Sequence, residues 1–193
     1  MEVILAIFSY LLGSIPTGYI VGKLAGLDIR RSGSGNIGAT NVARVAGKGH
    51  GLVTLAADTA KGFVPAIIAQ QLSFSHTAVA VIAAAAFLGH LYPVFLRFQG
   101  GKGVATAFGI LLALAPMATL AVMGVFTAVI LASRTVSLSS IGAAVAAPVA
   151  LWLFSYPLPW IVMTALFAAV IILRHRANIQ RLLRGTEPKF GRD

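Results

Sequence analysis

The chain has no cysteine among its 193 residues. It therefore forms no disulfide, carries no thiol nucleophile and gives no indication of its redox compartment. Charged residues are also scarce, at 10%, whereas 58% of the residues are hydrophobic and the mean hydropathy is +0.90. Too few polar side chains are present to coat a soluble globule of this size, so the composition predicts an integral membrane protein.

Acidic residues are particularly few, with five Asp and Glu against 15 Lys and Arg, which gives a formal net charge of +10. Such an excess is also seen in nucleic-acid-binding proteins. Here, however, the basic residues interrupt long apolar runs and form no continuous basic surface with interleaved aromatic residues. We therefore expect membrane lipids and anionic substrates as partners, and no nucleic acid.

Several catalytic signatures are missing as well. An acyltransferase pattern of His followed five residues later by Asp is absent, because those positions hold Leu55, Val81, Phe95 and Gln180. A nucleotide P-loop around Lys102 would need Gly at 96 and Ser or Thr at 103, where the chain has Leu96 and Gly103. No second ligand accompanies His90, which favours packing or hydrogen bonding over metal binding. We expect no metal and no cofactor.

Apolar runs close to the roughly 20 residues that cross a hydrocarbon core divide the chain. Spans are expected at about Val3–Val21, Leu52–Leu72, Thr77–Leu96, twice within Val104–Ser133 around Pro116, at Leu138–Phe154 and at Leu158–Leu173. Lys and Arg are absent from the loops near residues 72, 116 and 156 but present in the others. This alternation predicts seven crossings, with the N-terminus outside and the C-terminus in the cytoplasm. The expected fold is an all-α integral membrane protein, one domain over residues 1–193, with some short or broken helices.

Three polar stretches, at about residues 27–51, 97–106 and 174–187, would then share the cytoplasmic face. The second follows Pro93, where an apolar helix gives way to a glycine-rich loop around Lys102. Glycines at 100, 101 and 103 allow tight turns and close approach of a ligand to the main chain. The apolar helix that follows would direct its first amides and positive dipole end at an anion. The alternative is a plain cytoplasmic turn whose lysine obeys the positive-inside rule.

The first polar stretch combines Ser34 and Asn36 with several glycines that favour turns. If a helix begins near Gly38 or Ala39, Thr40 and Arg44 lie four apart on one face. The stretch can then bind an anion, or it can be an ordinary connection with a short amphipathic helix. Asp58 and Lys61, three apart within a span, are either a site candidate or a mutually satisfied ion pair.

The third stretch contains His175 and Asn178, spaced as helical neighbours, with Gly185 as a plausible helix end. It can contribute to a site, or it can be a basic juxtamembrane helix held by anionic lipids. From the residues alone, a small anion transporter competes with an enzyme. A transporter should carry polar groups across the membrane. The outer halves of these spans contain few polar groups, which argues against a transporter.

The chain resembles the bacterial acyl-phosphate-dependent glycerol-3-phosphate acyltransferases of the PlsY type. The resemblance rests on SGNIGATN at 34–41 with Arg44 beyond it, GGKGVAT at 100–106, RHRANIQRLLRGTE at 174–187 and DTAKG at 58–62. It covers nearly the whole chain in the right order. It implies a seven-helix membrane enzyme that acylates the 1-hydroxyl of glycerol 3-phosphate from acyl phosphate, the first step of phospholipid synthesis. The products would be lysophosphatidic acid and phosphate.

The resemblance also implies roles for individual residues. The glycine-rich motif would bind glycerol 3-phosphate, and polar residues of the other two motifs would be needed for activity. The expected catalytic residues are Ser34, His175 and Asn178. The expected substrate-binding residues are Asn36, Thr40, Arg44, Lys61, Gly100, Gly101, Lys102 and Gly103. No obligate protein partner is evident, and the enzyme would work at the cytoplasmic side of the bacterial inner membrane.

Overall fold

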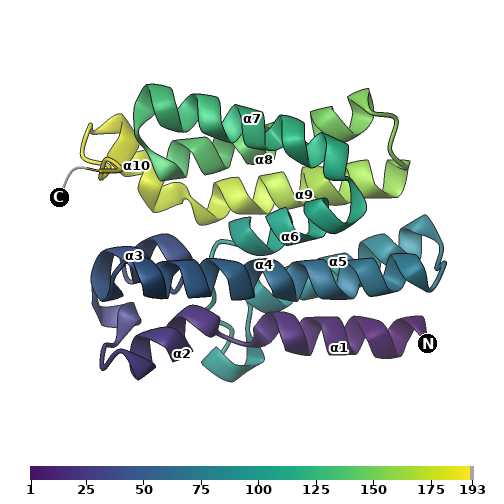
Figure 1. Cartoon of the computed structure of the whole chain (residues 1–193), viewed down its shortest axis with the longest axis horizontal. Helices are drawn as coiled ribbons and strands as arrows, with labels where there is room; N and C mark the ends of the chain where they lie inside the picture. The colour runs from purple at the N-terminus through teal and green to yellow at the C-terminus, as the bar shows by residue number, and fades with distance from the viewer. Residues whose placement is uncertain (192–193) are drawn as a thin grey trace. The chain divides into compact units, whose positions relative to one another are not determined.

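The structure, a computed structural model, describes residues 1–191 and contains helices but no strands over that range (Figure 1). This confirms the all-α prediction. The chain divides after Leu114 into two compact units, unit 1 covering residues 1–114 and unit 2 beginning at Ala115. The expected single domain stays a prediction.

Unit 1 contains six α-helices and two short 3₁₀ helices among the residues described. In chain order these are α1 (Glu2–Ser14), α2 (Thr17–Leu24), η1 (Ile29–Arg31), α3 (Ala39–Ala46), α4 (Lys48–Gln71), α5 (His76–Leu91), η2 (Val94–Leu96) and α6 (Val104–Leu114). Helix α1 packs along α5, and α4 packs along α6, α3 and α5. The glycine-rich loop at 97–103 therefore connects two helices that both contact α4.

Helices α4 and α6 touch through their backbones at two reciprocal points. Gly62 of α4 lies against the carbonyl of Thr106, and Gly109 of α6 lies against the carbonyl of Thr59. A Cβ at either glycine would overlap the opposite main chain. Small residues at such crossings are the usual means of close helix packing in lipid, where no hydrophobic effect drives helices together.

The first apolar segment is broken, as its glycines and proline predict. Helix α1 ends at Ser14 and α2 begins at Thr17, with Ile15 in an extended conformation before Pro16. A residue that precedes proline disfavours the helical region, because the proline ring clashes with its backbone. The break exposes main-chain carbonyl groups that a continuous helix would have used.

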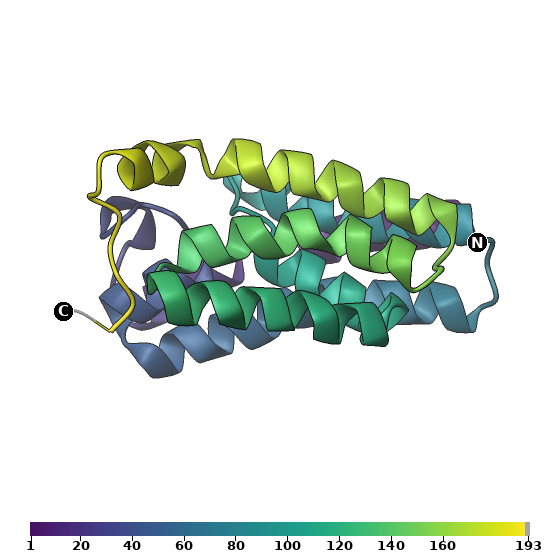
Figure 2. The ribbon, with the colours of Figure 1, turned by 90° about the horizontal axis from the view of Figure 1, so that it is seen from above.

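Unit 2 contains four helices among the residues described. These are α7 (Pro116–Ser133), α8 (Val136–Leu153), α9 (Leu158–Arg174) and α10 (Arg176–Leu183). Helix α8 packs against both α7 and α9, and Figure 2 shows it between them. The short connection at Arg134 and Thr135 reverses the chain, and so does the longer one at 154–157.

Five helical stretches in the described residues are long and apolar enough to cross a membrane. They are Glu2–Leu24, Lys48–Gln71, His76–Leu96, Pro116–Ser133 and Val136–Leu153. Helices α9 and α10 together form a sixth candidate, bent by 59°, and α6 is a shorter apolar helix. The 11-residue α6 agrees with the expectation of some short or broken helices, whereas the count of seven crossings and their orientation stay predictions.

Candidate functional site

Asn41 organises the first polar loop. Its side chain is buried, and its Oδ1 accepts a hydrogen bond from the Ser34 amide at 2.8 Å. Its Nδ2 donates to three main-chain carbonyls, those of Ile29 at 3.3 Å, Ser32 at 3.0 Å and Asn36 at 2.9 Å. One amide thus fixes the path of residues 29–36. Sequence reasoning noted Asn41 but gave it no role, because these contacts depend on the folded loop.

The predicted side chains of this loop lie on its outer surface. Ser34, Thr40 and Arg44 are exposed, while Asn36 is half-buried and accepts a hydrogen bond from the Gly38 amide at 2.8 Å. Helix α3 begins at Ala39, which confirms the expected start and gives Thr40 and Arg44 their helical spacing. The loop therefore presents a hydroxyl from Ser34, a second from Thr40 and a guanidinium within one short segment.

A charged pair, Asp28 and Arg30, lies near the start of this loop. The Arg30 guanidinium hydrogen-bonds to Asp28 and holds the pKa of that carboxyl below its ordinary value. Arg30 also stacks over the Tyr19 ring, 4.5 Å from its centroid. These contacts connect the loop to α2 and leave Arg44 as a separate cation on α3.

Asp58 and Lys61 form a buried ion pair within α4, with 2.9 Å between Lys61 Nζ and Asp58 Oδ1. The same lysine nitrogen donates to the Ile15 carbonyl at 3.1 Å, in the break between α1 and α2. The sequence left two alternatives for these residues, a site or a mutually satisfied ion pair, and the structure shows the ion pair. A substrate-binding role for Lys61 stays a prediction, although two protein groups already contact its amino group.

The glycine-rich loop folds back onto the end of α5. The Gly101 amide donates to the His90 carbonyl at 3.1 Å. A Cβ on Gly100 would overlap the carbonyls of His90 and Leu91, and one on Gly101 would overlap the imidazole of His90. Packing against α5 thus demands glycine at both positions, a reason that the sequence alone does not reveal.

Gly103 and Lys102 complete the loop. Gly103 has φ of +86°, which glycine adopts at little cost, and a Cβ there would also overlap the Phe87 ring. Its carbonyl accepts the Ala107 amide at 2.8 Å, so α6 begins directly after the loop, as expected. Lys102 is half-buried between these glycines. The amides that open α6 and this lysine can together attract an anion.

The third motif lies in unit 2, where the helix bends at His175. Helix α9 ends at Arg174, one residue after the predicted end of the span, and α10 begins at Arg176. His175 is 2% exposed, and its Nδ1 lies 2.8 Å from the Ile171 carbonyl. A carbonyl only accepts, so Nδ1 carries the proton, and Nε2 of the neutral ring holds the lone pair.

The Glu187 carboxylate contacts several polar residues around this motif. Its Oε1 accepts hydrogen bonds from Asn178 at 2.6 Å and from Ser137 at 2.8 Å, and its Oε2 lies 2.7 Å from Arg181 Nε. Burial raises the pKa of Glu187, but the hydrogen bonds from Asn178, Ser137 and Arg181 outweigh it and hold the pKa below its ordinary value. Sequence reasoning quoted Glu187 within a motif but assigned it no role.

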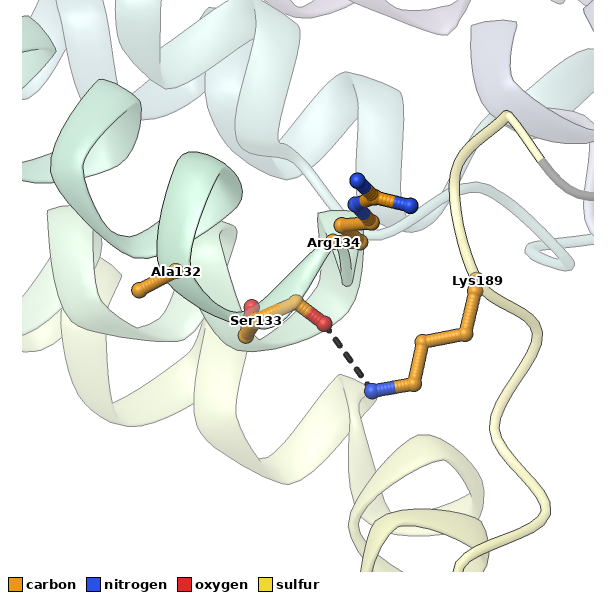
Figure 3. Close-up of a pocket in the computed structure, with 4 residues that line it drawn as sticks. All are labelled: Ala132, Ser133, Arg134 and Lys189. Carbon is orange, nitrogen blue, oxygen red and sulfur yellow. Dashed lines mark hydrogen bonds between the residues drawn. The ribbon is translucent and has the colours of Figure 1, made fainter.

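Two pockets are lined by other residues. One, of about 330 Å³, is lined by Ala132, Ser133, Arg134 and Lys189, with Lys189 Nζ donating to the Ser133 carbonyl at 3.0 Å (Figure 3). The other, of about 590 Å³, lies along α1 and α5 and is mainly apolar. Neither contains a residue that the sequence predicted for the site.

The predicted residues are thus divided between the units. Unit 1 holds the first two motifs, both packed on α4, and unit 2 holds His175 and Asn178. Along α4, Gly51 meets Ala43 of α3 and Gly62 meets Thr106 of α6. At 1.5 Å per residue these points are about 16 Å apart. Their convergence with the third motif in one site stays a prediction. Within residues 1–191 no three His, Asp or Glu residues are grouped as metal ligands would be.

Comparison with known proteins gives consistent matches. A family model for glycerol-3-phosphate acyltransferase matches residues 3–185. The glycerol-3-phosphate acyltransferase of Geotalea daltonii is 48% identical over 191 residues, which cover 99% of this chain and 98% of that protein. The enzyme of the same name from Aquifex aeolicus is 46% identical, covering 96% of this chain and 97% of that protein.

A solved structure is similar as well. It is the crystal structure of PlsY (YgiH), described as an integral membrane glycerol 3-phosphate acyltransferase, in its glycerol 3-phosphate form. It is 45% identical, covers 98% of this chain and 96% of that chain, and has a TM-score of 0.95. These matches confirm the resemblance drawn from the motifs and the membrane character of the protein. Since they extend over almost the whole length, this chain belongs to the glycerol-3-phosphate acyltransferase family.

Proposed function

We propose that this protein transfers a fatty acyl group from acyl phosphate to the 1-hydroxyl of sn-glycerol 3-phosphate. The observation that carries the proposal is its likeness to PlsY, whose structure is known in a glycerol 3-phosphate form and in a lysophosphatidic acid form. Those two molecules are an acceptor before acylation and the product after it. The reaction would be the first step of phospholipid synthesis.

In the proposed reaction the 1-hydroxyl oxygen attacks the acyl carbon and the bond from that carbon to the phosphate oxygen breaks. The products are 1-acyl-glycerol 3-phosphate and phosphate, and the hydroxyl proton leaves to phosphate or to a protein base. Acyl phosphate is a mixed anhydride with a good leaving group. Positioning and charge stabilisation can therefore supply most of the rate without a covalent enzyme intermediate.

Both substrates carry phosphate, which gives the basic residues of unit 1 a function. Lys102 and the amides that open α6 would bind one phosphate, because main-chain donors and a lysine are well suited to phosphate oxygens. The exposed Arg44 guanidinium would bind a phosphate through two parallel hydrogen bonds. Ser34, Asn36 and Thr40 would add directional hydrogen bonds.

The polar residues of unit 2 would act on the reacting hydroxyl. Nδ1 of His175 faces the Ile171 carbonyl, so Nε2 is the ring nitrogen that would meet the substrate. We propose that it orients the acceptor hydroxyl by a hydrogen bond, with Asn178 beside it holding the glycerol backbone. The proton then passes to a phosphate oxygen of the substrate.

The proposed setting is the bacterial cytoplasmic membrane, crossed seven times, with the site on the cytoplasmic side. Membrane lipids surround the protein, and neither a cofactor nor an obligate protein partner is required. Acyl phosphate would approach through the lipid, because its fatty chain favours the membrane, and glycerol 3-phosphate would approach from water.

The test is an assay of purified protein with glycerol 3-phosphate and one donor at a time: acyl phosphate, acyl-CoA or acyl carrier protein. We expect lysophosphatidic acid from acyl phosphate alone. Lys102→Met should abolish most activity, whereas Lys48→Met, the same change at an exposed lysine at the start of α4, should not. Product from acyl-CoA in place of acyl phosphate would refute the donor assignment.

A further inference from the structure

Unit 1 contains a buried polar network that the proposed reaction does not use. Asp58 Oδ1 accepts the Thr17 hydroxyl of α2, lies 2.9 Å from Lys61 Nζ and lies 3.6 Å from Nδ1 of His90 on α5. Asp58, Lys61 and His90 are each at most 5% exposed. Ionisable groups are costly inside a membrane and usually serve a function or support one. This network connects α2, α4 and α5.

His90 also connects the network to the glycine-rich loop. Its carbonyl accepts the Gly101 amide at 3.1 Å, so its main chain anchors the loop. Its ring occupies the space where a Cβ on Gly101 would lie, and the three atoms nearest to that position all belong to the imidazole. Nδ1 therefore faces Asp58 while the Nε2 edge faces Gly101.

We propose that Asp58 and His90 are positioning residues that hold the glycine-rich loop in its phosphate-binding conformation. The carboxylate, itself fixed by Lys61 and Thr17, sets the orientation of the imidazole. The ring in turn supports the main chain of Gly101 and so the placement of Lys102. This inference rests on the proposed function of the loop, and neither Asp58 nor His90 contacts substrate in it.

The inference gives Gly101 a different role from the one its motif implies. If the glycine serves close approach of a ligand, a methyl group at 101 blocks the ligand whatever stands at position 90. If the glycine makes room for the His90 ring, a methyl group is harmful only while that ring is present. Gly100 supplies the contrast, because its Cβ would overlap carbonyls and Pro93, which no change of the His90 side chain removes.

A double-mutant cycle distinguishes these roles. We expect Gly101→Ala and His90→Ala each to raise the KM for glycerol 3-phosphate by about tenfold or more, with a smaller change in kcat. The double variant should be no worse than Gly101→Ala alone, because the methyl group enters the space that the ring leaves. The matched control, Gly100→Ala, should combine with His90→Ala multiplicatively. Multiplicative effects for Gly101→Ala as well would overturn the proposal.

A second measurement does not depend on activity or on the cycle variants folding. We expect Asp58→Asn to increase amide hydrogen exchange in residues 99–104 by about tenfold or more, while α5 stays protected. Asp28→Asn is the control, since it makes the same change at a half-buried carboxylate that is paired with Arg30 outside this network. Unchanged exchange of the loop in Asp58→Asn would also overturn the inference. An inactive wild type would instead refute the proposed function and leave the exchange result to decide on positioning.

Discussion

His175 lies at the point where two helices meet, and the Ile171 carbonyl helps to fix its ring. Its Nδ1 faces the carbonyl of Ile171, four residues earlier, and it is buried where α9 gives way to α10. His50 has the same local arrangement at the start of α4, with its Nδ1 2.6 Å from the Ala46 carbonyl. The two histidines therefore allow a matched comparison of a motif residue with one that has no expected role.

We expect His175→Gln to retain part of the wild-type kcat, with a loss of about tenfold or less. A glutamine amide can donate to the Ile171 carbonyl or bond the substrate hydroxyl in place of one ring nitrogen. Loss of a general base costs about 10² to 10⁴ in rate. The measurement is kcat and KM as functions of pH, with His50→Gln as the control. A loss in the larger range, together with disappearance of the acid limb of the profile, would identify His175 as the base.

The sequence predicts residue chemistry better than residue partners. Motif spacing indicates that Arg44, Lys102 and His175 matter, and the ion pair of Asp58 with Lys61 follows from helical periodicity. The role of Asn41 could not be predicted, because its three carbonyl partners come together only when residues 29–41 fold. The contact of Gly101 with His90 could not be predicted either. The motif shows a glycine at 101 but does not show whether it leaves room for a ligand or for a side chain.

At the scale of elements, helix ends that depend on local chemistry were predictable. Pro16 and Pro116 break apolar runs, and α3 begins at Ala39, within the expected start at Gly38 or Ala39. No proline or glycine lies at the break at His175. It coincides with the return of the chain after α10, where Glu187 bonds Ser137 of α8 and Asn178 of α10. The predicted span ends at Leu173, next to this break, and tertiary hydrogen bonds accompany the break.

We expect Glu187→Gln to lower the stability of the folded protein at neutral pH by about 1.5 to 3 kcal/mol, the range for hydrogen bonds to charged groups. The pKa of Glu187 is lowered by folding, so the ionised carboxylate stabilises the fold above the ordinary glutamate pKa. That contribution is lost as pH falls through the ordinary value towards the lowered one. The difference between wild type and variant should therefore shrink on acidification.

Thermal unfolding in detergent, followed from pH 7 to pH 3, measures this difference. Glu2→Gln is the control, because Glu2 is an exposed carboxylate in the first turn of α1. A difference between wild type and Glu187→Gln that stays constant over the whole pH range would refute the electrostatic explanation.

At the scale of the whole molecule, charge pattern and helix length give different kinds of information. The loops that contain Lys and Arg alternate with loops that lack them, which predicts seven crossings. Helix length and hydropathy give five spans in residues 1–191, or six with the bent α9 and α10. Short helices such as α6 explain why the two counts of spans differ. A helix of 11 residues is too short to be counted as a span by its length, whether or not it enters the membrane.

Single cysteines in this cysteine-free chain can determine the sidedness of each loop in intact cells. We expect Arg31→Cys, Gln99→Cys and Thr186→Cys to be protected from an impermeant maleimide, and Ser73→Cys and Ser155→Cys to be labelled. All five positions are exposed. In the glycine-rich loop, Gln99 is the labelling position rather than its neighbour Gly100, because a side chain at 100 would overlap carbonyl groups. The unsubstituted chain is the control. Labelling at Gln99 from outside would refute a cytoplasmic site.

The ion pair within α4 also bears on how the protein is made. A lone Asp or Lys at the centre of a helix costs about 2.5 to 3.5 kcal/mol during insertion into the bilayer. Because Asp58 and Lys61 lie one helical step apart, they can neutralise each other as soon as α4 forms. The two charges inside the span can therefore enter the bilayer as a neutral pair, before α4 packs against α1 and α2. The Ile15 carbonyl and Thr17 hydroxyl then serve as docking points for this segment during assembly.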